Sequence, residues 1–282
     1  MSRSSSRLSV WVLSGLTWGI ILVMLILPLV LIFTEALRDG ISASLASFSD
    51  PDALQAIRLT VVMTILSVII NTFCGVMAAW ALSRYRFTGR SALITLIELP
   101  ISISPVVAGL VWLLLFGAQG WWGDIMLRLG FPVAFAAPGI LLATLFVTFP
   151  YVTRTLLPLM EQQGRISEEA AMLLGAGFWQ ILFRVTLPEA RWALLSGILL
   201  TTARAMGEFG AVSVVSGHIP GMTETMPLHI ETLYNGYQTV AAFSMATLLA
   251  LMAMVTVAAR SVLEKQSGQK ESSSVTSGAK AV

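Results

Sequence analysis

Six long apolar stretches, separated by polar stretches, divide this chain of 282 residues. They lie near residues 9–33, 56–83, 92–117, 138–160, 192–215 and 239–262. A helix needs about 20 apolar residues to cross a bilayer, and each stretch has that length. Several contain proline or glycine, which packed membrane helices tolerate because neighbouring groups satisfy the freed backbone. The pattern predicts an all-α integral membrane protein, a bundle of six transmembrane helices.

Composition agrees with a membrane protein and argues against a soluble one. The chain is 56% hydrophobic and 11% charged, with a mean hydropathy of +0.82. Soluble domains carry about 25% charged residues. The single cysteine, Cys74, excludes an internal disulfide framework.

The first apolar stretch is expected to be an uncleaved span. Arg3 and Arg7 precede it, as in a signal peptide. The stretch is longer than the 7–15 apolar residues of a signal-peptide core, and the sequence that follows lacks a clear small-residue cleavage site.

The arginine and lysine residues predict the orientation. With the N-terminus inside, the outer side holds only Arg38, Arg58 and Arg128, and Arg154 and Arg204 fall within apolar stretches. The inner side collects Arg3, Arg7, Arg84, Arg86, Arg90, Arg165, Arg184, Arg191, Arg260, Lys265, Lys270 and Lys280. This positive-inside bias, with an even number of spans, places both termini in the cytoplasm. The outer loops are then near 34–55, 118–137 and 216–238.

Three regions follow from this arrangement. Residues 1–53 hold the first span and the first outer loop, and residues 54–262 form the main transmembrane domain, with a cytoplasmic loop at 161–191. Residues 263–282 are rich in serine, glycine, lysine and glutamine. Such a composition predicts a disordered cytoplasmic tail.

The 161–191 loop should contain a short helix from about Glu168 to Leu174. Ser167 can cap its N-terminus, and Glu168 and Glu169 would favour the first turn electrostatically. Gly175 can supply the left-handed residue that ends the helix. Pro188 suits the first position of a new helix.

The same loop carries a spaced motif, Glu169-Ala170-Ala171, then three residues, Gly175, and later Leu187-Pro188. It resembles the EAA loop of ABC-importer permeases, with Val185 where the family often has isoleucine. The resemblance implies that an ATPase subunit docks here, through Glu169, Ala170, Ala171, Gly175, Leu187 and Pro188. The alternative is a loop that only caps its own helix bundle.

Two charges lie within the fifth apolar stretch. Arg204 and Glu208 are four residues apart and therefore share one face of a helix. Charge inside a membrane usually faces a cavity or a partner. The pair either holds the bundle together or lines or gates an anion path, with Arg204 the better anion-facing candidate. Gly207 and Gly210 would allow another helix to approach closely.

A second unusual patch lies in the third apolar stretch. Pro100 and Pro105 should break or kink the helix. Ser102 and Ser104, between them, could face an aqueous path. The alternative, which is slightly favoured, is a packing kink in which the serine hydroxyls bond to the preceding turn.

Three strings carry a more specific resemblance. They begin at Ser104 (SPVVAG), Arg204 (RAMGEFGAVSVVSG) and Pro227 (PLHIE). Together with the EAA loop they are similar to permeases of sulfate/thiosulfate ABC importers, of the CysW type, over about residues 50–262. The resemblance implies a complex in the bacterial inner membrane with a second, T-type permease, a periplasmic sulfate/thiosulfate-binding protein and an ATPase dimer. The ATPase would bind ATP and Mg²⁺.

Other classes of function fit less well. A permease for another oxyanion such as molybdate is an alternative, because such permeases resemble the string at Arg204 less closely. An ion-coupled secondary transporter could use Arg204 and Glu208, but it would leave the EAA loop without a role. The sequence has no GxxxxGK[ST] phosphate-binding loop, and His218 and His229 stand alone on the outer side. We therefore expect no enzymatic activity, resident cofactor, metal or nucleic-acid partner. The lipid bilayer is an expected partner.

Overall fold

The protein folds as a bundle of helices, with no strand among residues 3–278. We describe it from a computed structural model that places these residues, with side chains described for residues 10–263. The longer helices are α1 (Arg3–Ile21), α2 (Leu27–Ala36), α4 (Pro51–Arg84), α5 (Arg90–Ser102), α6 (Pro105–Phe116), α8 (Ala137–Thr148), α9 (Pro150–Gln163), α13 (Arg191–Met206) and α16 (Thr239–Gly278). The remaining elements are η1 (Leu22–Ile26), α3 (Ile41–Ser47), α7 (Gly123–Arg128), α10 (Ile166–Leu173), α11 (Phe178–Ile181), η2 (Leu182–Thr186), α12 (Leu187–Glu189), α14 (Gly210–Val215) and α15 (Met226–Asn235), where η marks a π-helical turn.

Four continuous helical segments are long and apolar enough to cross a membrane. They are Val10–Ala36, Pro51–Arg84, Ala137–Gln163 and Thr239–Leu263. They match the first, second, fourth and sixth predicted stretches.

The third predicted stretch is bent, as its prolines predicted. Helices α5 and α6 meet at an angle of 105° and together would give a fifth span. The break falls between Ser102 and Pro105, because a proline cannot donate the next helical hydrogen bond.

The fifth predicted stretch, 192–215, is not one helix. It divides into α13 and α14 at Gly207–Phe209. The Ala211 N–H, in the first turn of α14, bonds to the side chain of Glu208 at 3.0 Å instead of continuing the α13 ladder. The prediction of a continuous helix here was wrong, because a side chain satisfies the backbone at the break.

Short helices also occupy the three loops that the charge pattern predicts to be on the outer side, where the hydrophobic pattern predicted none. These helices are α3, α7 and α15. Pro227 stands in the first turn of α15, where its fixed φ and missing N–H fit the helix start.

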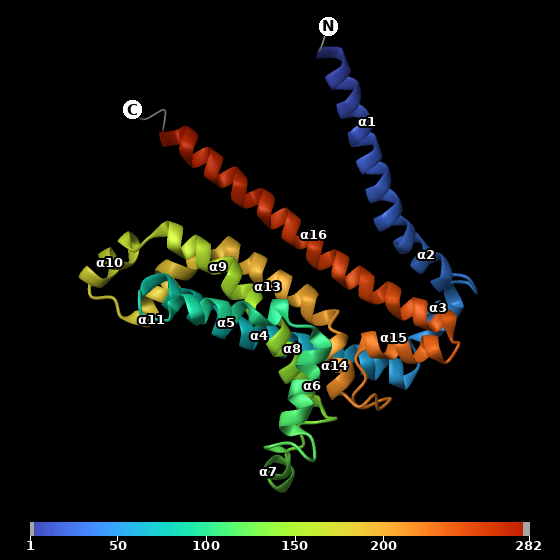
Figure 1. Cartoon of the computed structure of the whole chain (residues 1–282). Helices are drawn as coiled ribbons and strands as arrows, with labels where there is room; N and C mark the ends of the chain where they lie inside the picture. The colour runs from blue at the N-terminus through green and yellow to red at the C-terminus, as the bar shows by residue number, and fades with distance from the viewer. Residues whose placement is uncertain (1–2, 279–282) are drawn as a thin grey trace.

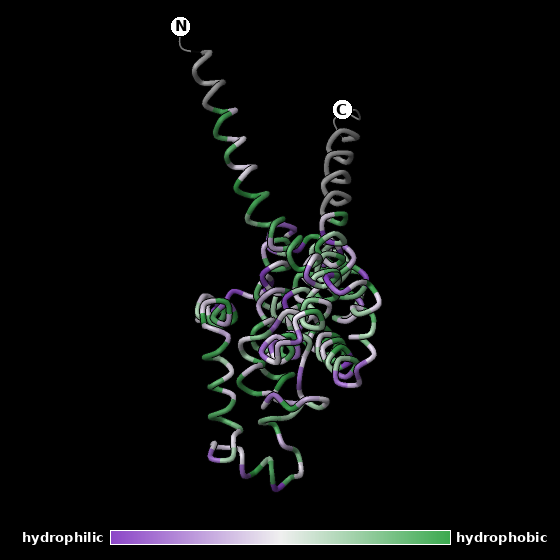
Figure 2. The backbone as a smooth tube through the Cα atoms, turned by 90° about the vertical axis from the view of Figure 1, so that its right-hand side faces the viewer, coloured by the Kyte–Doolittle hydropathy of each residue, from purple (hydrophilic) through white to green (hydrophobic). Residues whose placement is uncertain are grey.

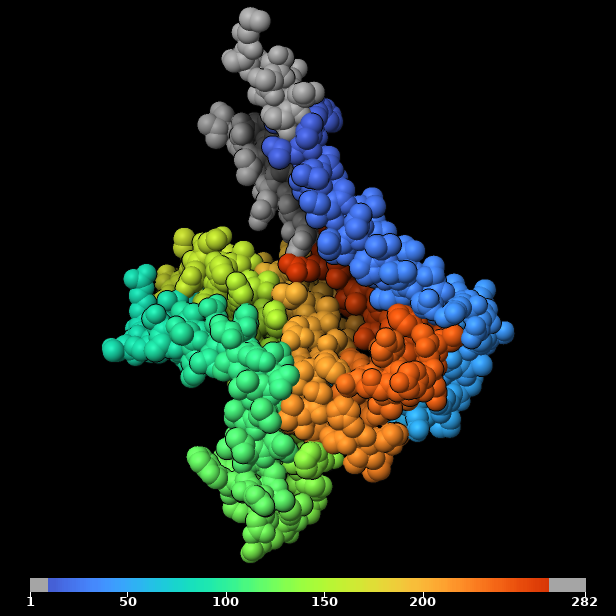
Figure 3. All heavy atoms as spheres, turned by 45° about the vertical axis from the view of Figure 1, so that its right-hand side comes forward, coloured from blue at the N-terminus to red at the C-terminus, as the bar shows by residue number. Residues whose placement is uncertain are grey.

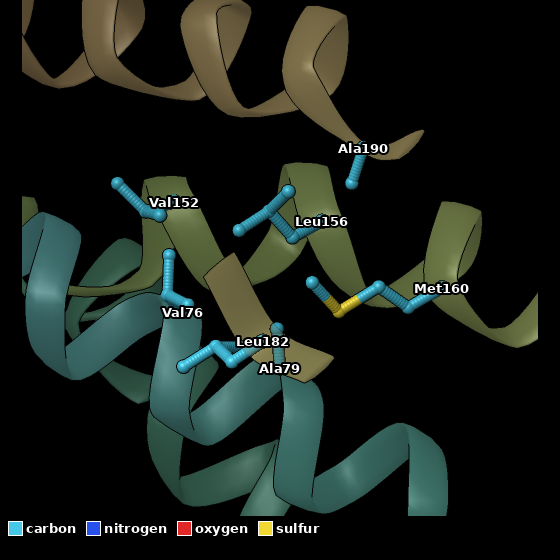
Figure 4. Packing of buried hydrophobic residues seen from close by; sticks show 7 residues of the cluster. All are labelled: Val76, Ala79, Val152, Leu156, Met160, Leu182 and Ala190. Atoms are coloured by element: carbon cyan, nitrogen blue, oxygen red, sulfur yellow. The ribbon is translucent and has the colours of Figure 1, made fainter. Parts of the chain in front are cut away.

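The main core joins α4 and α9 to the segment 182–190. Seven buried side chains form it, from α4, from α9, and from the segment that leads into α13 (Figure 4): Val76, Ala79, Val152, Leu156, Met160, Leu182 and Ala190. Gly75 lets the helices approach, since a Cβ there would lie 2.7 Å from Val152 Cβ. The end of the 161–191 loop is therefore anchored in the bundle.

The two ends of the bundle differ in structure. Helices α10 and α11 lie at one end, and α3 and α15 lie at the other (Figure 1). The first span stands clear of the bundle over most of its length (Figure 2), and none of its most apolar window is buried. The last helix continues to Gly278. Side chains beyond Leu263 lie outside the described residues, so the disordered tail over 263–282 stays a prediction.

Candidate functional site

The short helix expected in the 161–191 loop is present as α10, Ile166–Leu173. It begins two residues earlier than predicted. Arg165 takes the N-cap position without a side-chain cap bond, so the predicted Ser167 cap was wrong. Gly175 adopts a φ of +83°, and the N–H groups of Gly175 and Ala176 bond to the carbonyls of Met172 and Ala171. This is the left-handed helix end that the glycine predicted.

A buried ion pair fastens α10 to the bundle. Arg84 Nε and Nη2 donate to the two carboxylate oxygens of Glu168 at 2.7 and 2.8 Å. The side chains are only 7% and 5% exposed. Arg84 Nη1 also donates to the Met160 carbonyl at 2.9 Å, and Thr186 Oγ1 donates to Glu168 Oε1 at 2.6 Å. Four segments therefore meet at one carboxylate–guanidinium pair.

The outward face of α10 carries apolar side chains with nothing packed on them. Leu173 and Leu174 are each 89% exposed, and Ile166 is also exposed. Glu169 and Ala170 lie on the surface beside them, and Ala171 is half-buried. Isolated exposed leucines are common, but adjacent ones at the end of a short helix indicate a contact surface.

A cavity of about 430 Å³ lies next to this helix. It is lined by residues of α4, α10 and α11, with the aromatic rings of Trp80 and Phe178 in edge-to-face contact at 4.8 Å. Glu168 and Glu169 both contribute to its wall. The two acidic neighbours thus differ: Glu168 is buried in an ion pair with Arg84, and Glu169 is exposed at the surface.

Leu187 and Pro188, the last two residues predicted to dock the ATPase, differ in burial. Leu187 is half-buried and packs against the main core, while Pro188 is exposed. Leu187 therefore faces the bundle rather than the surface that α10 presents.

A second polar region lies where the two broken helices meet. Helix α6 packs along α14, and a Cβ on Gly109 would lie 2.6 Å from the Ala211 carbonyl oxygen. A Cβ on Gly210 would lie 3.0 Å from Pro105 Cβ. Glycine at both positions therefore allows the two breaks to lie against each other.

The two charges of the fifth stretch form an ion pair at this place. Arg204 Nη1 lies 2.9 Å from Glu208 Oε2. Glu208 is 1% exposed, and Arg204 is 33% exposed. The other carboxylate oxygen of Glu208 accepts the Ala211 N–H. Glu208 thus holds both the helix break and the guanidinium of Arg204 in place. The Arg204 side chain stays partly exposed.

Ser102 and Ser104 lie at the bend between α5 and α6, and both are exposed. Among the residues that the structure describes, neither hydroxyl makes a hydrogen bond. The alternative of serines bonded to the preceding turn is therefore not seen. The two hydroxyls are available to another molecule.

Arg84, Glu168 and Thr186 were not singled out from the sequence as a unit. Arg84 is 84 residues from Glu168, so no local pattern connects them. The one available signal was the pair of adjacent acidic residues, of which only one can face outward on a short helix. No group of His, Cys, Asp and Glu within the described part of the chain could hold a metal ion.

These features define a class of protein: a multi-pass membrane transport subunit. It has apolar spans, two broken helices that meet at an ion pair, and a helix at one end of the bundle that is held by a buried ion pair. The model of the family described as binding-protein-dependent transport system inner membrane component matches residues 71–267. The chain belongs to this family of inner-membrane permeases of ABC transporters.

The relatives at the level of sequence are transport permeases. The chain is 46% identical over 258 residues to a sulfate transport system permease protein CysW from Synechocystis, covering 92% of this chain and 94% of the relative. The CysW protein of Escherichia coli K12 is 46% identical over 254 residues, covering 90% and 87%. A probable sulfate permease cysT of Nephroselmis olivacea is 34% identical over 249 residues, covering 88% and 87%.

Solved structures show the same fold. A bacterial ABC transporter that imports the acidic polysaccharide alginate matches with a TM-score of 0.74 at 17% identity, covering 94% of this chain and 96% of that one. The same transporter type in complex with an alginate-bound periplasmic protein gives a TM-score of 0.74 at 18% identity, with the same coverage. The chain therefore has the fold of ABC-importer permeases, as the sequence predicted.

Proposed function

We propose that this chain is the membrane permease subunit of an ATP-driven sulfate/thiosulfate importer and forms half of its translocation pore. The observation that carries the proposal is the 46% identity to sulfate transport permeases over more than nine-tenths of the chain. The chain is a transport subunit rather than an enzyme, and the hydrolysis of ATP belongs to a partner. ATP and Mg²⁺ are bound by that partner.

The cytoplasmic partner is an ABC ATPase dimer that docks on α10. Support comes from the exposed leucines of this helix and from Glu169, Ala170 and Gly175, which lie at the surface. Force from the ATPase would pass from α10 into α4 through the Arg84–Glu168 pair. Leu187 packs against the main core, so its part would be to hold the loop segment that carries Pro188 on the bundle.

The other partners are a T-type permease and a periplasmic sulfate/thiosulfate-binding protein. Burial within this chain is low along the first span and at the bend between α5 and α6. A second permease subunit that covers such surfaces fits a pore made from two chains. The binding protein would supply most of the substrate specificity.

The topology has six crossings with both termini in the cytoplasm. The four long spans supply four crossings, and the bent pair α5–α6 and the broken pair α13–α14 supply the other two. The excess of arginine and lysine in the inner loops supports this orientation.

The translocation path passes the place where the two broken helices meet. Arg204 offers a partly exposed guanidinium, which suits a tetrahedral oxyanion because its planar set of N–H donors can bind two oxygens. Glu208 holds Arg204 in position, and the pair would act as a gate. Ser102 and Ser104 offer hydroxyl donors at the bend between α5 and α6.

The test is transport by the complete reconstituted complex. We expect ATP-dependent uptake of radiolabelled sulfate that thiosulfate competes for, and a loss of both the ATPase subunit and uptake when Glu169 and Gly175 are disrupted. Uptake of molybdate in preference to sulfate would reject the assigned substrate. Retention of the ATPase and of uptake after both disruptions would reject the assigned docking surface.

A further inference from the structure

Two exposed arginines line an open groove at one end of the bundle. Arg86 follows α4, and Arg165 stands just before α10. The groove has a volume of about 610 Å³, and its walls come from residues 83–86 and from Glu161, Gly164 and Arg165. Figure 3 shows α5, in teal, beside the end of α9, in yellow-green, at this edge of the molecule. Two segments far apart in the chain therefore bring two guanidiniums to one groove.

The other charges of the groove are paired, and these two are not. All three nitrogens of the Arg84 guanidinium donate within the protein, and its charge is neutralised by a buried ion pair. Glu161 forms an ion pair with Arg90. Among the residues that the structure describes, neither Arg86 nor Arg165 has a side-chain hydrogen bond or an ion pair. Within the described part of the chain, the groove therefore carries two positive charges without counter-charges.

The groove lies at the level of the lipid head groups. Helix α4 has no charged residue between Arg58 and Arg84, a stretch of 25 residues that is about 37 Å long. This length falls between the roughly 30 Å of the hydrocarbon core and the roughly 40–45 Å of the whole bilayer. Tyr85, between Arg84 and Arg86, is exposed, and tyrosine is enriched at the boundary between membrane and water. The two arginines that bracket the stretch thus mark the two boundaries.

An apolar cavity adjoins the groove. The 430 Å³ cavity beside α10 shares Arg84, Tyr85 and Arg165 with it. The other walls of the cavity include the rings of Trp80 and Phe178. The Tyr85 ring meets the Trp80 ring edge to face, with the ring centroids 5.7 Å apart. A molecule with a negative head and an apolar body would therefore find both kinds of surface side by side.

We propose that the groove binds the phosphate group of an anionic membrane lipid, with Arg86 and Arg165 as its ligands. Arginine suits a phosphate because the guanidinium can donate two parallel N–H bonds to its oxygens. Basic pockets between membrane helices bind lipid head groups by the same chemistry. A free oxyanion such as sulfate shares the negative charge but has no apolar part, so the neighbouring cavity favours the lipid.

A phosphate held by both arginines would connect the end of α4 to the residue before α10. It would add to the buried pair of Arg84 and Glu168, which joins the same two helices. The effect of the lipid on transport rests on the proposed function, because α10 is there assigned to ATPase docking. Binding of the lipid requires only the groove and a bilayer boundary at the end of α4.

The experiment uses the complete complex in phosphatidylcholine vesicles that contain increasing amounts of a photoreactive phosphatidylglycerol. After illumination, mass spectrometry quantifies the label on peptides of this chain that contain residues 83–86 or 164–166. Arg86→Gln, Arg165→Gln and the double variant are compared with Arg184→Gln. Arg184 is the matched control, because it is an exposed arginine of η2 that does not line the groove.

We expect each single groove variant to need about fivefold more phosphatidylglycerol for half-maximal labelling. The double variant should lose most of the label, and the control should match the wild type. Arg86→Lys keeps the charge and should lose less than Arg86→Gln. Subunit composition and melting temperature are measured for every variant, and the single variants decide the outcome if the double variant does not assemble.

Three results would overturn the proposal. Equal labelling of the wild type and of all groove variants would show that the arginines hold no lipid. Loss of the label in millimolar sulfate, but not in sodium chloride of the same ionic strength, would assign the groove to a free oxyanion. Loss of the ATPase from the groove variants without a change in labelling would assign the arginines to a subunit contact.

The proposed function can fail separately. A complex that imports no sulfate, but whose labelling still depends on Arg86 and Arg165, would reject the proposed transport function and support the lipid site.

Discussion

Arg84 and Glu168 stand 84 residues apart in the chain and form a buried bidentate ion pair between the end of α4 and α10. The guanidinium also holds the end of α9, and Thr186 shares the carboxylate. A buried pair of this kind contributes little net stability, because desolvation offsets the attraction. Its consequence is geometric: α10 cannot tilt without moving α4.

Removing one partner should therefore be more harmful than removing both. Glu168→Met leaves the Arg84 guanidinium buried without a counter-charge, which costs about 3–5 kcal/mol. The double change Arg84→Met with Glu168→Met should cost less than the sum of the two single changes. Thermal unfolding of the purified permease without the ATPase, analysed as a double-mutant cycle, measures the coupling.

The neighbouring residue supplies the control for this prediction. Glu169→Ala removes an exposed carboxylate one residue away, so stability should change by less than about 0.5 kcal/mol. Additive costs for Arg84 and Glu168, or an equal loss for Glu169→Ala, would show that the pair does not fasten α10.

A change at Gly175 should disrupt the end of α10. Its φ of +83° is strained for any residue with a Cβ, and Gly175→Val should cost about 1–3 kcal/mol locally. The exposed leucines before it would then shift, so less ATPase should co-purify with the permease. Gly177→Ala is the matched control, because Gly177 has a φ of −77° and nothing within 4 Å of a Cβ. If both variants retain the ATPase equally, the turn at Gly175 does not position the docking surface.

The contact between the two broken helices should be sensitive to a single methyl group. Gly109→Ala would place a Cβ 2.6 Å from the Ala211 carbonyl oxygen and 2.9 Å from Val214 Cβ, so α6 and α14 must separate. Overpacking of this kind costs about 1–3 kcal/mol. We expect a lower melting temperature and reduced uptake. Gly207→Ala should be mild in comparison, since the nearest atom to its Cβ is the Ala203 carbonyl oxygen at 3.8 Å. Equal effects of the two changes would argue against a close contact at Gly109.

The features that were predictable from the sequence are local ones. Apolar stretches predicted four of the spans, Pro100 and Pro105 predicted the bend, and Gly175 predicted the end of α10. Each depends on residues within a few positions of one another. The family resemblance added the role of the loop, which no local pattern contains.

What was missed depends on contacts between distant segments. Glu168 and Glu169 are adjacent and chemically alike, and a rotation of about 100° around α10 decides which one is buried. That rotation is set by Arg84 and Thr186, from other parts of the chain. The break at Gly207–Phe209 was missed for a similar reason. Hydropathy is averaged over a whole stretch, so it does not show that the Glu208 side chain satisfies the backbone N–H of Ala211.

Glu208 carries out two tasks that substitution can separate. One carboxylate oxygen accepts the Ala211 N–H at the helix break, and the other lies 2.9 Å from Arg204 Nη1. Glu208→Gln keeps an oxygen acceptor for the N–H and removes the charge. It should leave the fold intact and release the guanidinium, so the complex should assemble normally but bind sulfate more tightly and turn over more slowly.

Glu208→Ala removes both functions and should destabilise the break by about 1–3 kcal/mol, because a buried N–H then loses its partner. Arg204→Ala should abolish most uptake while assembly persists, since Glu208 retains the backbone bond. Melting temperature, subunit composition and sulfate uptake, measured on the three variants together, decide between a gate and a structural pair. Loss of assembly in Arg204→Ala, with no specific loss of uptake in Glu208→Gln, would assign the pair to holding α13 and α14 in place.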